Sequence, residues 1–377
     1  MGSETYQIHS FDCRDCSLPV TIGLRKVVAG GRIEGEENVR ILDGNFEDAT
    51  VMNFHASFAF DGTTIHDRYA FPSILLAQKV HPFVRVVSES RVQDLALVFE
   101  VPNCQHLWGT VRNALALSRQ GANDRKLRRL LEDYRRQREK CVGCTAISDA
   151  KDLIHNFFDS MFYPRFELLA KPVEEHIAQL RATATTELKR FISYYRANHW
   201  DESYARNISL FTDYFRAFTE FSQMLTYARI DDQDVIGKLV GSRNFEHTKL
   251  FYGQAFEVLT SGFVVLACLN NILCGRPFDE FQQMTLNKYV HDVEKAKRAN
   301  PFKDEPALCR FAEHLDSSLR NGSHHASIWR DGETVFYRSG GTGAQRDIPY
   351  SVYLHRCNEL AISCAALFVL EYELMAQ

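Results

Sequence analysis

The chain has 377 residues, of which 45% are hydrophobic and 24% are charged, and its formal net charge is -4. This balance is typical of a globular protein large enough for two domains, and it excludes an intrinsically disordered chain. The slightly acidic charge argues against a protein that coats nucleic acid non-specifically, because such binding requires many lysines and arginines to neutralise phosphates. Any contact with nucleic acid is therefore expected to be local.

Residues 1–145 are predicted to form an α+β domain. Two segments, 50–60 and 95–101, have the alternation or the short apolar run that is typical of β-strands. The N-terminal sequence Met-Gly-Ser-Glu-Thr-Tyr lacks a basic segment followed by an apolar stretch. We therefore expect no secretory signal and a cytoplasmic protein.

Two Cys-x-x-Cys pairs flank this domain, and their members are Cys13, Cys16, Cys141 and Cys144. Each pair has the spacing of half a tetrahedral zinc site, and ten cysteines in a chain without a secretory signal favour reduced thiols or metal ligands over disulfides. We predict that the fold brings both pairs together around one structural Zn²⁺. Unrelated reduced thiols are the alternative, and two further candidate ligands are Cys104 and His106.

A basic run at residues 125–140 follows. Its apolar members fall at helical spacing, which predicts a helix with an apolar stripe and a solvated basic face: Leu127, Leu130, Leu131 and Tyr134. A basic face that contacts RNA is the alternative.

Residues 146–377 are predicted to form a helical bundle, with long helices at 150–170, 173–198, 203–229, 246–274 and 279–298. Helix breakers, including Pro164 and Pro172, are expected at the helix boundaries. The most apolar stretch, Ala255 to Cys274, is about as long as a membrane span, but Glu257 and two asparagines interrupt it. A charged side chain is costly in hydrocarbon, so this stretch is predicted to be a buried core helix and no membrane contact is expected.

Three elements are predicted near the C-terminus. Apolar residues repeat at three- and four-residue intervals from Pro306 to Leu319, which predicts a helix. The segments 326–330 and 334–338 flank Asp331-Gly332-Glu333, which indicates a β-hairpin. An apolar helix is predicted from about Pro349 or Ser351 to Met375.

The most informative motif is Arg320-Asn321 followed by His324 and His325. The planar fork of arginine suits phosphate oxygens, and imidazole transfers protons near neutral pH, so the pair could hold and cleave a phosphodiester without a metal. In an unbroken helix Arg320 shares a face with His324. A break at Asn321-Gly322 would instead turn His325 toward the arginine. Both histidines are therefore candidates for proton transfer.

The stretch from Asp316 to His325, with its preceding helix, hairpin and closing helix, resembles HEPN domains, in particular those of bacterial defence and toxin proteins. The resemblance covers about residues 205–377 and depends mainly on Arg320, Asn321 and His325. It implies a metal-independent endoribonuclease in which two HEPN domains dimerise and form one composite site. In that site Arg320 would stabilise the transition-state phosphate, His325 would transfer protons, and Asn321 would orient the pair.

The chemistry fits RNA, including tRNA, because attack by a ribose 2′-OH requires a base, an acid and a cation near the developing charge. The resemblance implies a homodimer in bacterial defence or a toxin system, controlled by the N-terminal half, a regulatory protein or a phage trigger. A non-catalytic HEPN-like module for binding or dimerisation is one alternative. A second alternative is a metal site whose ligands would be His314, Asp316, His324 and His325. Residues 314 and 316 would diverge on a helix, however.

Overall fold

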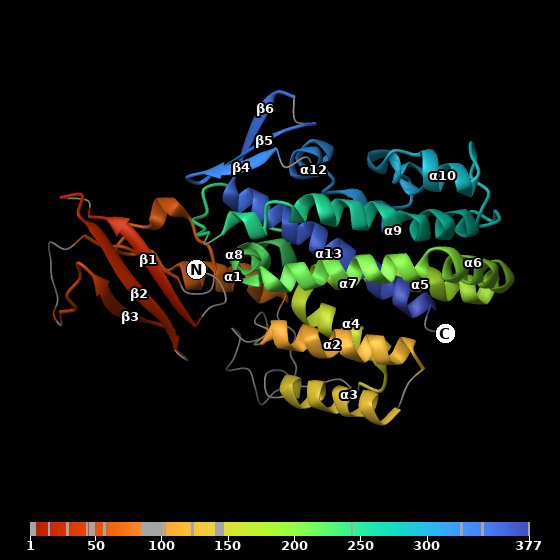
Figure 1. Cartoon of the computed structure of the whole chain (residues 1–377), viewed down its shortest axis with the longest axis horizontal. Coiled ribbons are helices and arrows are strands. Elements are labelled where there is room, and N and C mark those ends of the chain that lie inside the picture. The colour runs from red at the N-terminus through yellow and green to blue at the C-terminus, as the bar shows by residue number, and fades with distance from the viewer. Residues whose placement is uncertain are drawn as a thin grey trace.

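The computed structural model describes residues 5–13, 16–27, 30–42, 44, 50–55, 58–83, 101, 103–121, 124–139, 147–242, 244–324, 327–340 and 343–375. The molecule is mainly helical and has two small antiparallel sheets of three strands, one near each end of the sequence (Figure 1). The predicted combination of a β-containing N-terminal part and a helical bundle is therefore confirmed at this level.

The N-terminal sheet consists of β1 (Tyr6–Asp12), β2 (Pro19–Val27) and β3 (Gly30–Glu37), and it lies at one end of the molecule (Figure 1). The strand predicted at residues 50–60 is wrong, because its described residues have no strand partner. They are anchored on a helix instead: the Ala59 amide donates to the Gln223 carbonyl at 3.1 Å, and the Tyr227 hydroxyl donates to the Ala59 carbonyl at 2.6 Å. The other predicted strand falls mostly at residues 84–100, outside the described residues.

A short helix, α1 (Pro72–Val80), precedes the helical layers. Helices α2 (Cys104–Arg119) and α3 (Asp124–Glu139) pack on each other, and α2 also packs on α4 (Ala150–Phe162) and α7 (Trp200–Arg216). The Trp108 ring lies within 6 Å of Phe157, Phe158 and Phe211. Helices on both sides of the boundary predicted near residue 145 thus share one hydrophobic core, and that boundary itself lies outside the described residues.

The predicted helix in the basic run is confirmed as α3, with Leu131 and Tyr134 buried against α2 and α4. The bundle continues with α5 (Arg165–Thr183), α6 (Thr185–Asn198), α8 (Phe218–Arg229), α9 (Phe251–Leu273) and α10 (Leu286–Asp292). Pro172 lies inside α5 and not at a helix boundary, so that assignment was wrong. The segment predicted as a helix at 279–298 is helical mainly at α10.

Helix α9 is the apolar stretch that has the length of a membrane span. The range Phe245–Leu273 is long and apolar enough to cross a membrane, but 78% of its most apolar window is buried inside the protein. The prediction of a core helix is confirmed. Figure 1 shows α9 running alongside α7, with α13 (Tyr350–Met375) between the helical layers.

The helix predicted from Pro306 to Leu319 is wrong as a continuous element. A short helix, α11 (Pro306–Cys309), ends first, and a new helix, α12 (Ser317–His324), begins after a turn. The hairpin is confirmed as β4 (Ile328–Asp331) and β5 (Thr334–Arg338), and a third strand, β6 (Gln345–Pro349), extends it. The closing helix α13 is also confirmed, and nearly all of its residues are buried.

Candidate functional site

The Arg/His motif lies on α12, whose N-terminus is fixed by Asp316. One carboxylate oxygen of Asp316 accepts from the amides of Ser318 at 2.8 Å and Leu319 at 3.1 Å, which is helix capping. The other oxygen accepts from the Arg356 guanidinium at 3.1 Å. The Tyr252 hydroxyl accepts from the Asp316 amide at 2.8 Å. These contacts explain why the chain starts a new helix at this point.

Two small residues bring α12 into close contact with its neighbours. A Cβ atom on Gly322 would lie 2.8 Å from Cβ of Tyr337 on β5, so only glycine fits there without a shift. The Ser323 hydroxyl donates to the Lys249 carbonyl at 2.8 Å and accepts from the Gly253 amide at 3.2 Å. Helix α12 is therefore clamped between α9 and the C-terminal sheet.

This packing keeps the helix intact through Asn321 and Gly322, so of the two geometries that the sequence left open, the structure has the unbroken helix. Arg320 lies in the middle of the helix and not at its end. His324 is the last helical residue and is exposed, one turn from Arg320 on the same face. His325 is adjacent to His324 in sequence and lies outside the described residues.

The guanidinium of Arg320 is held by two partners. Its Nε and Nη2 atoms donate to Oε1 of Glu257 on α9, the former at 2.7 Å, and its Nη1 donates to the Asn321 side-chain oxygen at 2.7 Å. The Asn321 amide in turn lies 3.4 Å from the Ser339 hydroxyl at the end of β5. Asn321 thus contacts both Arg320 and Ser339, and the Arg320 side chain remains 23% exposed.

A second cation lies on the other side of Glu257. Lys295 Nζ is 3.8 Å from Glu257 Oε2 and donates to the Ser261 hydroxyl one turn along α9. Burial and the charge of Arg298 lower the pKa of Lys295 to about 8, although the Glu257 carboxylate acts in the opposite direction. Arg320, Lys295 and Glu257 thus form a half-buried cluster that carries two positive charges and one negative charge.

The outer face of the C-terminal sheet begins beside this cluster. Trp329 is 39% exposed and stacks on Phe336 with ring centroids 5.8 Å apart. The Arg338 guanidinium lies 5.8 Å from the Trp329 ring, and its chain neighbour Ser339 contacts Asn321. An aromatic surface with a cation is therefore linked to the motif by a short chain of contacts.

Sequence reasoning missed Glu257 and Lys295. One signal was available, because a glutamate within the most apolar stretch of the chain must find a buried or half-buried partner. In the sequence, Glu257 argues against a membrane span but does not identify its partner. Lys295 begins a short 3-10 turn in a polar segment and gives no comparable signal.

One half of the predicted zinc site is described. Cys13 and Cys16 lie in the turn between β1 and β2, where the Ser17 amide donates to the Cys13 carbonyl at 2.8 Å. Cys13 is half-buried and Cys16 is exposed. The second pair falls at residues 140–146, outside the described residues. Among the further candidates, Cys104 is buried, which raises its pKa to about 12 and disfavours a thiolate ligand.

The alternative with His314 and Asp316 as joint metal ligands disagrees with their contacts. Asp316 caps α12, whereas His314 Nδ1 faces Glu359 at 3.2 Å. His314 does lie close to the carboxylates of Asp231 and Glu359. The guanidinium of Arg165 already occupies that cluster, because it pairs with Asp231 and lies 2.9 Å from His314 Nε2.

No family model, curated protein or solved structure matches the chain.

Proposed function

We propose that the protein is a metal-independent endoribonuclease of the HEPN type. The observation that carries this proposal is the position of Arg320: it is central in a clamped helix, oriented by Asn321 and flanked by a second cation. Arg320 and Lys295 would stabilise the negative charge that develops on a phosphate when the ribose 2′-OH attacks. His325 or His324 would transfer the protons. The exposed Trp329 would stack a base of the bound RNA.

The remaining parts of the proposal come from the resemblance. Two copies of the chain would form a homodimer with a composite site, and the setting would be bacterial defence or a toxin system acting in the cytoplasm. The N-terminal part would control or target the nuclease. A structural Zn²⁺ bound by both cysteine pairs would hold this N-terminal part together. In that site four thiolates would fill the zinc coordination sphere and leave no position open for catalysis.

A non-catalytic HEPN-like binding or dimerisation module is the second candidate. It is favoured by the contacts of Arg320, whose guanidinium is already satisfied by Glu257 and Asn321 without any substrate. A phosphate would have to compete with the Glu257 carboxylate for the same donors. A purely structural arginine would need no such exchange.

The test is cleavage of total cellular RNA and of tRNA by the purified chain with excess EDTA. Wild type should produce 2′,3′-cyclic phosphate ends, and Arg320→Ala should abolish cleavage. Comparing His324→Ala with His325→Ala identifies the histidine that transfers protons. Arg310→Ala, at an exposed arginine ten residues earlier, is the matched control and should cleave normally.

Activity that survives in both Arg320→Ala and His325→Ala would remove the motif as the site. A wild type that binds RNA but does not cut it would support the binding module. The dimer is tested separately by sedimentation equilibrium of the wild-type chain, where a monomer at all concentrations would exclude a composite site.

A further inference from the structure

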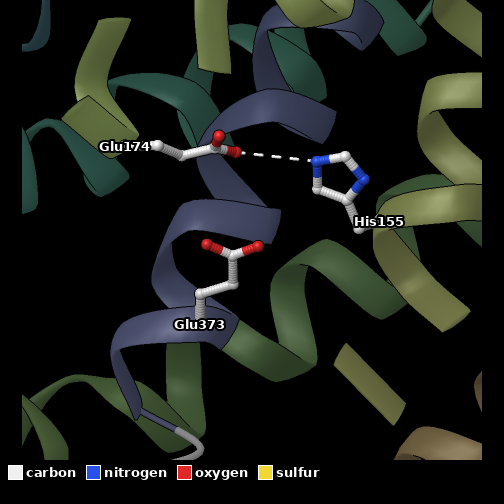
Figure 2. A group of neighbouring side chains, drawn as sticks. All are labelled: His155, Glu174 and Glu373. Carbon is white, nitrogen blue, oxygen red and sulfur yellow. Dashed lines mark ion pairs between the residues drawn. The ribbon is translucent and has the colours of Figure 1, made fainter. Parts of the chain in front are cut away.

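A second constellation of chemically active side chains lies at the opposite end of α13 from the C-terminal sheet. His155 on α4, Glu174 on α5 and Glu373 in the last turn of α13 converge, and Figure 2 shows the imidazole and the two carboxylates turned toward one another. One ligand atom from each residue lies within 4.8 Å of the other two. The three residues come from separate parts of the sequence, so no spacing motif announces them.

The Glu174 carboxylate faces His155 and has one oxygen that accepts no hydrogen bond from the described part of the chain. Its Oε1 atom is enclosed and accepts no hydrogen bond from any described residue. It forms an ion pair with His155, whose Nε2 atom is 3.6 Å away (Figure 2), and this carboxylate raises the pKa of His155. A metal ion would therefore have to displace a proton from His155 Nε2. An enclosed carboxylate oxygen that has one long ion pair and no hydrogen bond is only partly compensated for its lost hydration.

The Asp231, His314 and Glu359 cluster provides an internal comparison, since it has the same kinds of side chain. There the protein supplies its own donors. The guanidinium of Arg165 pairs with Asp231, and the Gln233 amide donates to Glu359 at 2.9 Å. No such donor reaches Oε1 of Glu174 from the described residues.

We propose that His155, Glu174 and Glu373 bind a divalent transition-metal ion. Imidazole and carboxylate are the ligands that Zn²⁺ and Mn²⁺ take in proteins. Metal–ligand bonds of about 2.0–2.2 Å place ligand atoms on one ion about 3–4 Å apart. The 3.6 Å between His155 Nε2 and Glu174 Oε1 falls in this range. The T-shaped contact of His155 with Phe166 holds the ring on the side of the ligands.

The ion would connect the last turn of α13 to α4 and α5. Glu373 is 23 residues beyond Tyr350, the first residue of α13. At 1.5 Å per residue this is about 35 Å along the helix, so the ion lies at the far end of α13 from the C-terminal sheet, and its ligands include no residue of the Arg320 cluster. With three protein ligands, water completes the coordination sphere. The ion stabilises the C-terminal end of the bundle.

The experiment measures Mn²⁺ binding to the full chain by loss of the electron paramagnetic resonance signal of free Mn²⁺. Manganese is chosen because thiolates bind it weakly, so the cysteine pairs do not interfere. Wild type, Glu174→Gln and Glu373→Gln are compared with Glu175→Gln, which removes the same charge from the exposed neighbouring position of α5. Thermal unfolding is followed in parallel with increasing Mn²⁺.

We expect one Mn²⁺ per chain in wild type and in Glu175→Gln, and a melting temperature that rises with the Mn²⁺ concentration. Glu174→Gln and Glu373→Gln should each weaken binding by at least about tenfold, since loss of even an outer-sphere partner costs that much. The proposal would be overturned if the wild type failed to bind Mn²⁺. It would also be overturned if Glu174→Gln and Glu373→Gln both bound Mn²⁺ as tightly as the wild type does. Glu373→Gln, in a half-buried terminal turn, guards against a folding defect in the other variant.

Discussion

The pair between Arg320 and Glu257 fixes the geometry of the candidate site, and its strength can be measured by a double-mutant cycle. The variants are Arg320→Ala, Glu257→Ala and the double substitution. Charge-assisted hydrogen bonds contribute about 1.5–3 kcal/mol each to stability. The Nε and Nη2 atoms of Arg320 donate to the same oxygen of Glu257. The Arg320 side chain is 23% exposed and the Glu257 side chain is 28% exposed, so solvent screens part of the attraction between them. We therefore expect a coupling energy of about 1–2 kcal/mol.

The assay is urea unfolding of all four proteins at neutral pH, followed by circular dichroism, with unchanged slopes as the criterion for a two-state comparison. The control is the pair between Arg206 and Glu202 on α7, where the exposed fractions are 45% and 64%. That exposed pair should couple by less than about 0.5 kcal/mol. If both cycles give the same small coupling, Glu257 does not hold the arginine and the geometry argued for the site is wrong.

Three other predictions follow from buried groups and close contacts. Burial raises the pKa of Glu371 from 4.5 to about 8. The contribution of its protonated carboxyl to stability is therefore fully present below pH 4.5 and is lost as the pH rises through 8. In unfolding experiments across this pH range, Glu371→Gln should remove that decline in stability. Gly322→Ala should lower the free energy of unfolding by about 1–3 kcal/mol, because the added methyl group would clash with Tyr337 on β5. Gly109→Ala has open space on α2 and should raise the free energy of unfolding by about 0.5–1 kcal/mol, and thermal unfolding of both variants checks this. Trp329→Ala should weaken RNA binding by about 1–3 kcal/mol in a filter-binding assay, and unchanged affinity would exclude base stacking there.

Sequence patterns predicted the elements whose burial is nearly complete or whose turn chemistry is specific. Helices α9 and α13 have long apolar runs that only a core position can accommodate. The hairpin of β4 and β5 turns at Gly332, whose φ of +56° favours glycine. In each case one local feature of the sequence was sufficient to determine the structure.

The patterns failed where an apolar repeat had more than one structural solution. The sequence of residues 50–60 alternates as in a strand, but the consecutive residues Phe58, Ala59 and Phe60 are all buried, because the described part of this segment lies on α8 without pairing in a sheet. The repeat from Pro306 to Leu319 is satisfied by two short helices, because Asp316 and Tyr252 provide hydrogen bonds that start a new helix. β3 consists mainly of glycine and charged residues, and so it lacks the apolar signal of a strand.

The candidate site shows why a motif alone specifies so little. Arg320 and Asn321 are neighbours in sequence, but the groups that determine the charge around them come from 63 residues and 25 residues away, Glu257 on α9 and Lys295 beyond α10. Since α12 is clamped by Gly322 and Ser323, the backbone of the arginine is already in place and little ordering is required on binding. In the proposed cleavage, the partner of this guanidinium would change from the Glu257 carboxylate to a phosphate. The cluster has two cations for one carboxylate, and that excess positive charge favours the exchange.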